Sequence, residues 1–412
     1  MAKSFVSKIK FRHILYFFAL IAGWPCVFGL MGWLPDFKLC YMALAAVLGA
    51  ICLSKGALKT PQTITNLIFI QCVTWGLFSL IHSDTAYFTR IFYLVIVYML
   101  LALMYHYRET IRYVKIFNGW VLLQAVLGTI GVLLVLMNIL HPFFEFEQMD
   151  GRTGYFFGLF TTKAYWGGLV RNAGFFDEPG ALANWGVIAL LMNKIFLDDK
   201  LVERLLVIAL VSTFSMAYFI QVSLYLLLFN TKKKGGVFYA LIAFVLFFGV
   251  LTFFASFNED INHAIFGRFQ MDNTTGKLEG DNRTALTEVT LAYFLQAPIF
   301  GHGASGLIAL SQHSGEFVGG NPFSLLAADG IVGYGISLLP FIFILVKNRY
   351  KNKEILFAWL IILAGFFQRP YDGTQLLYPL LIYLFLQTEL LYNRTGFYTA
   401  LDKNIIIGKQ TH

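Results

Sequence analysis

Long runs without a charged side chain constrain this chain more than any other feature. A helix crosses the roughly 30 Å hydrocarbon core of a bilayer with about 20 residues, and several runs reach that length. The chain is 58% hydrophobic and 13% charged, and its mean hydropathy of +0.67 excludes a soluble domain. We therefore predict an all-α polytopic membrane protein that forms one integral membrane domain over residues 1–412.

Twelve of the runs are expected to form transmembrane helices. They cover residues 14–33, 38–54, 63–82, 86–105, 117–140, 181–197, 201–213, 216–230, 236–257, 322–346, 355–368 and 374–392. The stretch 201–230 could also form one long tilted helix. Basic clusters at Lys200–Arg204 and Lys232–Lys234 flank it, and both favour the cytoplasm. A short hairpin that turns at Ser212–Ser215 satisfies both clusters.

Charged residues predict the sidedness of these spans. Basic residues in membrane proteins mark mostly cytoplasmic loops. With both termini in the cytoplasm, most lysines and arginines fall inside and most acids fall outside. The net charge of +8 is thereby explained by topology, and no nucleic-acid partner is expected. The cysteines lie in or near early spans without a CxxC or Cys/His spacing, so we expect neither a disulfide framework nor a metal site.

Two segments on the expected outer side are long, at residues 141–180 and 258–321. The other connections are short. Long loops in a compact protein are where function tends to reside. Both segments carry glycines, aromatic residues and charges of both signs, so neither resembles a flexible linker.

The first long loop ends in the stretch RNAGFFDEPGALANW, from Arg171 to Trp185. A guanidinium suits phosphate or pyrophosphate because it presents a rigid fork of donors. Asp177 and Glu178 could serve as a base or bind sugar hydroxyls. The alternative is structural: an arginine–carboxylate pair closes the loop onto a helix whose first turn accepts Pro179 and the preceding acids. The residues leave both alternatives open.

The second long loop carries Arg268 and Arg283 on either side of a polar stretch. The run TALTEVTLAYFLQA follows, with Leu286, Val289 and Tyr293 at helical spacing. This spacing predicts an amphipathic helix that lies on the membrane.

A glycine-rich turn, PIFGHGASG, comes next at Pro298–Gly306. Its glycines would allow backbone amides to approach a ligand or helices to pack closely. No GKS or GKT follows, so nucleotide binding is unsupported. His302 and His313 are candidate general bases or ordinary surface residues. Arg369, at the last outer turn, is a candidate substrate ligand or a helix-end anchor.

Arginines, acids and aromatics gathered on one side suit an anionic lipid-linked sugar. Arginines would bind the pyrophosphate, and acids and aromatics would bind hydroxyls and ring faces. Neither a metal triad nor a DxD-like dyad is present, and we expect no metal and no cofactor.

Two stretches resemble a known family. R171-N-A-G-F-F-D-E-P-G180 resembles the R-x-x-G-x-F-x-E-P-G/S motif of O-antigen polymerases of the Wzy type. R283, the helix, A-P-I-F-G-H-G-A-S-G and N-P-F-S-L-L-A-A-D-G-I-V-G resemble the matching elements of the wider O-antigen polymerase and ligase superfamily. The pattern of twelve spans with two large periplasmic loops is similar too.

The resemblance implies a metal-independent, GT-C-like glycosyltransferase of lipopolysaccharide biosynthesis in the bacterial inner membrane. Its substrates would be oligosaccharides on undecaprenyl pyrophosphate within the membrane lipid, and a separate regulator protein could set chain length. By position in the motifs, Arg171 and Arg283 would hold the pyrophosphate and Glu178 is the motif acid. Arg268 and Arg369 are secondary candidates.

The chain departs from the ligase pattern at the entry to the helix after the second loop. Ligases carry a His-Asn pair there, whereas this chain reads G-G-N-P-F, with Asn321 and no histidine. His313 lies eight residues earlier, so the base stays unassigned. An O-antigen ligase, a lipid-linked oligosaccharide flippase and a membrane scaffold remain as alternatives. Against a flippase, the spans are nearly free of charge; against a scaffold, the charged loops are unexplained.

Overall fold

The computed structural model of the chain describes residues 10–22, 27, 31, 37–147, 153–163, 170–230, 249, 252, 284–314, 323–348, 352–368 and 376–395. Within this part, five helical segments are long and apolar enough to cross a membrane. They are α5 (Gln62–His82), α6 (Ala86–His106), α7 (Thr110–Leu136), α8 (Pro179–Met192) with its π-helical extension η1 (Asn193–Leu197), and the pair α15 (Ser324–Ser337) and α16 (Leu339–Asn348).

Six further helices complete the described part of the bundle. They are α2 (Phe11–Ala22), α4 (Phe37–Lys55), α9 (Lys200–Ala209), α10 (Met216–Asn230), α17 (Lys353–Gln368) and α18 (Leu377–Thr395). The helix lengths and compositions support the prediction of an α-helical membrane protein. The expected span 236–257 lies outside the described residues apart from positions 249 and 252, as does much of 14–33.

Helix α7 begins at Thr110, seven residues before the expected start of its span. Hydropathy placed the start after Arg112 and Lys115, where the charges end. A helix backbone continues past the membrane surface without cost, because charged side chains there remain in water. At 1.5 Å per residue, the 27 residues of α7 extend for about 40 Å, which is longer than the hydrocarbon core.

The stretch 200–230 forms a hairpin. Asp199 caps α9 by accepting hydrogen bonds from the amides of Leu201 and Val202. The helix tightens into a 3-10 turn, η2 (Leu210–Thr213), and Phe214 takes a left-handed conformation at φ 44 before α10 begins. The predicted break at Ser212–Ser215 is therefore confirmed.

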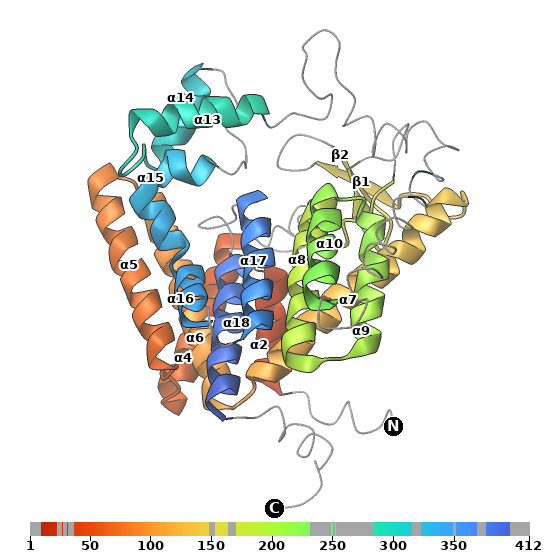
Figure 1. Cartoon of the computed structure of the whole chain (residues 1–412), viewed down its shortest axis with the longest axis horizontal. Helices are drawn as coiled ribbons and strands as arrows, with labels where there is room; N and C mark the ends of the chain where they lie inside the picture. The colour runs from red at the N-terminus through yellow and green to blue at the C-terminus, as the bar shows by residue number, and fades with distance from the viewer. Residues whose placement is uncertain are drawn as a thin grey trace, which may run out of the picture.

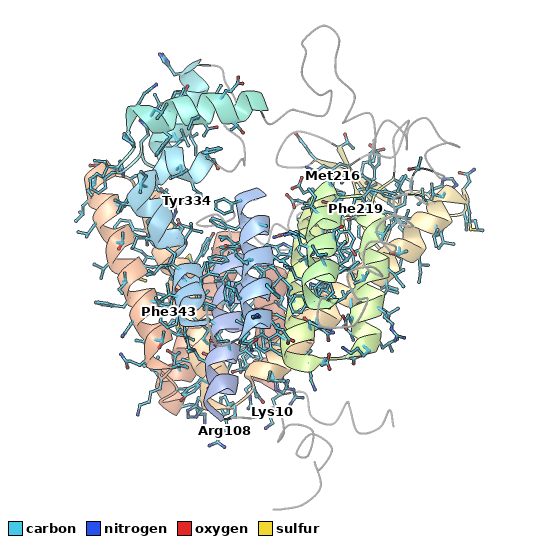
Figure 2. The ribbon with its side chains drawn as sticks, viewed as in Figure 1. Lys10, Arg108, Met216, Phe219, Tyr334 and Phe343 are labelled. Atoms are coloured by element: carbon cyan, nitrogen blue, oxygen red, sulfur yellow. The ribbon has the colours of Figure 1, made fainter. Side chains whose placement is uncertain are left out.

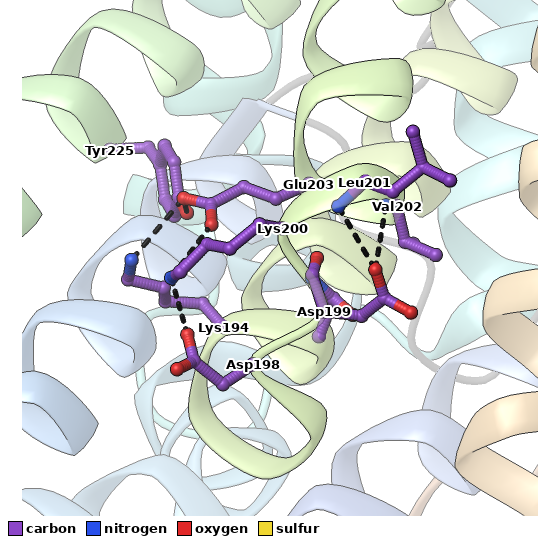
Figure 3. A network of polar contacts seen from close by, with 9 residues as sticks. Lys194, Asp198, Asp199, Lys200, Leu201, Val202, Glu203 and Tyr225 are labelled. Carbon is purple, nitrogen blue, oxygen red and sulfur yellow. Dashed lines mark hydrogen bonds and ion pairs between the residues drawn. The ribbon is translucent and has the colours of Figure 1, made fainter.

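Polar contacts join the two arms of this hairpin to the end of α8 (Figure 3). Nζ of Lys194 lies 3.3 Å from Oε1 of Glu203. The hydroxyl of Tyr225 on α10 donates to the same carboxylate, and Lys200 pairs with both Glu203 and Asp198. These contacts hold α8, α9 and α10 together where α8 ends and α9 begins.

Helix α8 lies at the centre of the right half of the bundle, beside α7, α10 and α17 (Figure 1). All of its 14 residues are buried. A helix that is apolar on every side packs only inside a protein or a membrane. Gly186 allows the hairpin to approach, since a Cβ there would lie 2.4 Å from a methyl of Leu210.

The first long loop contains a small antiparallel sheet beside the helical bundle. The strands are β1 (Phe144–Glu147), β2 (Thr153–Phe156) and β3 (Thr161–Thr162), in the order β1-β2-β3. The alternating sequence FEFE favours a half-buried strand, and Phe146 is buried while Glu145 and Glu147 are exposed. The sheet was not predicted, because the rest of the sequence favours helices.

The described parts of both long loops lie at one end of the bundle, which we call the loop end (Figure 1). The sheet lies above α7 and α10 on one side. Two helices of the second loop, α13 (Thr284–Gln296) and α14 (Ala304–Ser314), lie above α5 and α15 on the other side. The helix predicted after Arg283 is thus present as α13.

The opposite end of the bundle, which we call the basic end, carries Lys10 and Arg108, whereas Met216 and Phe219 lie toward the loop end (Figure 2). Both Nε and Nη2 of Arg12, in the first turn of α2, lie 2.6 Å from the carboxylate of Glu109 between α6 and α7. Described basic residues at this end include Lys10, Arg12, Lys55, Lys59, Arg108, Arg112, Lys115, Lys194, Lys200, Arg204, Lys347 and Lys353. Which side of a membrane this end faces stays a prediction.

Candidate functional site

The motif loop, which we define as residues 171–180, is docked on α7 through Asn172. This side chain is fully buried. Its amide nitrogen lies 3.5 Å from the carbonyl oxygen of Gln124 and 3.3 Å from that of Ala125, and its Oδ1 accepts from the amide of Gly174 at 2.8 Å. Position 128 of α7 must lack a side chain, because a Cβ on Gly128 would lie 2.0 Å from Oδ1 of Asn172.

The side chain of Gln124 provides a second contact between α7 and the motif loop. Its Oε1 accepts from the amide of Phe175 at 2.9 Å. Gly174 turns the chain at φ 60, and a Cβ there would lie 2.7 Å from Oε1 of Gln124. The ring of Phe175 stacks on Trp120 with centroids 5.7 Å apart. Helix α7 therefore sets the path of the motif loop.

Strand β3 holds the motif loop from the other side. The backbone amide and the hydroxyl of Thr161 donate to the carbonyl of Gly174 at 2.8 and 3.1 Å. The hydroxyl also lies 3.1 Å from the carbonyl oxygen of Phe176. The sheet is thus part of the framework that positions the motif.

Arg171 contacts the tip of the α9–α10 hairpin. Its Nε donates to the carbonyl of Thr213 at 2.9 Å, and its Nη2 donates to that of Phe214 at 3.1 Å. These carbonyls end a helix, where backbone acceptors lack intrahelical partners. Arg171 thereby stabilises the tip, a role that the sequence did not suggest.

Glu178 and Pro179 start α8 as the sequence predicted, although the helix begins two residues earlier than expected. Glu178 is extended at φ −152 and ψ 154, and its carbonyl accepts from the amide of Ala181 at 3.0 Å. Its carboxylate reaches toward Lys163, with Oε2 4.0 Å from Nζ. Asp177 is half-buried beside it. Sequence reasoning missed Lys163, whose only signal was a lysine in a loop expected outside.

In the second loop the glycine-rich turn serves backbone packing, which was one of its two predicted uses. Gly301 and Gly303 adopt φ values of 70 and 81. The amides of His302 and Gly303 donate to the carbonyls of Ala327 and Ala328 at 3.0 and 2.8 Å. A Cβ on Gly301 would lie 2.3 Å from the carbonyl oxygen of Ala328. The turn and α15 therefore fit backbone to backbone.

A buried ion pair lies under this turn. Asp329 is fully buried on α15, next to a kink at Gly330, where φ is 64. Its carboxylate accepts from Nη1 of Arg90 at 2.6 Å and from the hydroxyl of Tyr87 at 2.8 Å. The guanidinium lies 4.5 Å from the ring centroid of Trp75. The pair is fully partnered, as a buried ion pair must be to persist.

Asp84, between α5 and α6, ties the same region to α14. Its carboxylate accepts from the backbone amide of Ser305 at 2.7 Å and from the hydroxyl of Ser305 at 2.8 Å. Burial alone would raise the pKa of Asp84, but hydrogen bonds from Ser305 and from the amide of Ala86 outweigh burial and lower it. The second loop is thus fixed to α5, α6 and α15.

The two candidate histidines, His302 and His313, both lie in the second long loop. Nε2 of His302 lies 2.8 Å from the carbonyl oxygen of Tyr293. A carbonyl only accepts, so this nitrogen donates and His302 helps to hold α13 on the turn. His313 is exposed near the end of α14.

The predicted site residues fall into three groups. Arg171, Asp177 and Glu178 share the motif loop, and His302 and His313 lie across the same end of the bundle. Arg268, Arg283, Asn321 and Arg369 lie outside the described residues. Within the described part of the chain, no group of three or more His, Cys, Asp and Glu side chains is placed to hold a metal ion.

No family model, curated protein or solved structure matches this chain. The motif loop carries one cation, Arg171, and two carboxylates, Asp177 and Glu178, all half-buried. Lys163, outside the loop, adds a second cation 4.0 Å from Glu178. Such a set binds phosphate oxygens through the cations and hydroxyl groups through the carboxylates.

Proposed function

We propose that this chain is a lipid-linked glycan polymerase of the O-antigen type. It would join oligosaccharide repeat units carried on undecaprenyl pyrophosphate, on the periplasmic face of a bacterial inner membrane. The proposed architecture has twelve spans, a GT-C-like arrangement and both termini in the cytoplasm. The observation that carries the proposal is the docking of the motif loop: α7, β3 and the hairpin tip hold Arg171, Asp177 and Glu178 at the end where the second loop also lies.

The proposed reaction is a glycosyl transfer without a metal or cofactor. The oxygen of an acceptor hydroxyl on one lipid-linked repeat attacks C1 of the reducing-end sugar of the growing glycan. The new C–O bond forms as the bond from C1 to the pyrophosphate oxygen breaks. Undecaprenyl pyrophosphate leaves with the electron pair, and a base takes the acceptor proton.

Each predicted residue has a place in this scheme. Arg171 and Arg283 would stabilise the negative charge that develops on the leaving pyrophosphate. Glu178 and His313 are the candidates for the base. The remaining candidates would bind sugar or phosphate groups: Arg268, Asp177, His302, Asn321 and Arg369.

Deletion of the gene in its host, followed by electrophoresis of the surface glycan, tests the proposal. Loss of a polymerase leaves lipid A core capped with a single repeat. Uncapped core with polymer retained on the undecaprenyl carrier would favour a ligase instead. Uncapped core without polymer would favour a flippase, and an unchanged ladder would contradict all three.

Substitution of Arg171 tests the site itself. Arg171→Ala is expected to abolish long chains, and Arg171→Lys to shorten them, because lysine keeps the charge but lacks the fork that binds pyrophosphate. Arg108→Ala, at the basic end, is the matched control and should leave the ladder unchanged. Arg171 also stabilises the hairpin tip, so protein level and thermal midpoint are measured for each variant. Wild-type chain lengths in Arg171→Ala would exclude a pyrophosphate-binding role.

A further inference from the structure

Lys163 directly follows β3 and faces the first turn of α8. Its ammonium lies 4.0 Å from Oε2 of Glu178. At that separation opposite charges attract strongly, but the distance is too long for a hydrogen bond. The Lys163 side chain is 14% exposed and that of Glu178 is 28% exposed. Both groups are therefore largely shielded from water and still reach the surface of the loop end.

The position of Lys163 is fixed by contacts two residues earlier. Thr161 exchanges backbone hydrogen bonds with the motif loop, donating to the carbonyl of Gly174 at 2.8 Å and accepting from the amide of Ala173 at 3.0 Å. Thr161 also pairs with Phe156 of β2. Strand β3 therefore both hydrogen-bonds to the motif loop and places the ammonium of Lys163 beside that loop.

Lys163 brings a cation to a loop that already holds Arg171. The guanidinium of Arg171 donates to the carbonyls of Thr213 and Phe214. Lys163 adds a second cation beside the two acids. Basic residues are disfavoured on the outer side of a membrane, so a mostly buried lysine in an expected outer loop calls for a functional reason.

We infer that Lys163 binds the pyrophosphate group of the lipid-linked substrate together with Arg171, and that Glu178 orients its ammonium. This inference rests on the proposed function and adds a residue to its site. Lysine binds phosphate as a point charge. The leaving pyrophosphate gains negative charge as the glycosidic bond to C1 breaks, and a fixed ammonium stabilises that charge. Lys163 transfers no proton in this role.

Complementation of the deletion strain is the first arm of the test. Lys163→Met removes the charge and keeps the stem, and Lys163→Arg keeps the charge. Lys59→Met, at an exposed lysine of the basic end, is the matched control. We expect Lys163→Met to lose long chains while the other two retain them. Wild-type chains in Lys163→Met would overturn the inference and leave the proposed function standing. An unchanged glycan in the deletion strain itself would instead contradict the proposed function.

An exchange of charges separates substrate binding from a structural pair. Lys163→Glu combined with Glu178→Lys restores the attraction between the two positions. Binding of pyrophosphate to the purified protein is the readout, because chain length would also be lost if Glu178 is the base. If Lys163 contacts pyrophosphate, the double variant still binds it weakly. Recovery of wild-type binding would show that Lys163 acts only through Glu178 and would overturn the inference. Thermal midpoints identify variants that fail to fold, and Lys163→Gln replaces Lys163→Met in that case.

The second arm measures binding to the full-length protein purified in neutral detergent, with inorganic pyrophosphate as the probe. We expect Lys163→Met to weaken binding about tenfold or more, as the loss of one charge-assisted bond predicts, and Lys59→Met to leave it unchanged. Mixed micelles with an anionic phospholipid distinguish the other source of phosphate. Equal pyrophosphate affinity in wild type and Lys163→Met, or Lys163-dependent binding of the phospholipid alone, would overturn the inference.

Discussion

At the scale of single residues, the amide of Asn172 is the contact on which the motif loop depends. It joins the loop to α7 and, through Oγ of Ser212 at 3.1 Å, to the hairpin tip. Neither partner is near in sequence, since Gln124 and Ser212 are 48 and 40 residues away. A buried amide that loses such partners destabilises a protein by about 1–3 kcal/mol. Asn172 therefore makes a large contribution to the site without contacting substrate.

Gly128→Ala tests this contact from the side of α7. The added methyl would lie 2.0 Å from Oδ1 of Asn172, so the amide must move and leave its partners. We expect a loss of about 2–3 kcal/mol in unfolding free energy, together with shorter glycan chains. Gly119→Ala on the same helix is the matched control, because a Cβ there meets nothing within 4 Å. Equal thermal midpoints for the two variants would contradict the described docking.

Glu109 predicts a pH dependence at the basic end. Burial alone would raise its pKa, but hydrogen bonds from Arg12 and His13 outweigh burial and lower the pKa from 4.5 to about 2. Because the folded pKa lies below the unfolded one, the ionised carboxylate stabilises the fold above pH 4.5. That stability is lost as the pH falls toward 2.

Glu109→Gln should therefore destabilise the protein by up to about 3 kcal/mol near pH 7, a value that follows from the size of the pKa difference. The difference from wild type should shrink below pH 4.5 and vanish near pH 2. Thermal unfolding in detergent across this range measures it. Glu145→Gln, at an exposed residue of β1, is the control. A pH-independent difference for Glu109→Gln would exclude the ion-pair explanation.

At the scale of elements, the Arg90–Asp329 pair fixes α15 and the glycine-rich turn to α6. Arg90→Met would leave the Asp329 carboxylate buried without its cation, which typically costs about 3–5 kcal/mol. Arg90→Met combined with Asp329→Leu removes both charges and should recover most of that loss. Urea or thermal unfolding of the two single variants and the double variant gives the coupling between them. Additive losses would show that the pair does not act as a unit.

For α13, sequence periodicity was sufficient to predict the helix but not to predict which of its faces is buried. The helix was predicted with Leu286, Val289 and Tyr293 at helical spacing, and Val289 and Tyr293 are half-buried. Thr290 is fully buried, while Leu291 and Leu295 are exposed. The helix is apolar on two sides, so the sequence alone could not show which side meets α15. The exposed leucines are consistent with the predicted position on a membrane surface.

At the scale of the whole molecule, hydropathy predicted apolar helices, because the membrane imposes one physical requirement on every helix that crosses it. Five described segments are long and apolar enough to do so. Most described helices begin and end within three residues of the expected spans. The hairpin turn and the start of α8 were predictable from local residues such as Pro179. The Arg90–Asp329 pair was not, since its members are 239 residues apart. The hydrogen bonds from Arg171 to the hairpin tip were not predictable either, because their acceptors are backbone carbonyls, which every residue type carries.

The described parts of both long loops lie at one end of the bundle, and the described basic helix ends lie at the other. This arrangement suits the proposed transferase, because the pyrophosphate of its substrate would lie at the membrane surface and the isoprenoid tail among the helices. We propose a single active site built from both loops.

Reconstitution in liposomes tests the proposed glycan polymerase activity most directly. The purified full-length protein is placed in liposomes that contain EDTA and a lipid-linked repeat unit on undecaprenyl pyrophosphate, and the products are separated by length. The account predicts a ladder of longer lipid-linked glycans, with release of one undecaprenyl pyrophosphate for each bond formed, and no ladder with Arg171→Ala. An unchanged repeat unit after incubation with wild-type protein that is folded by its thermal midpoint would contradict it.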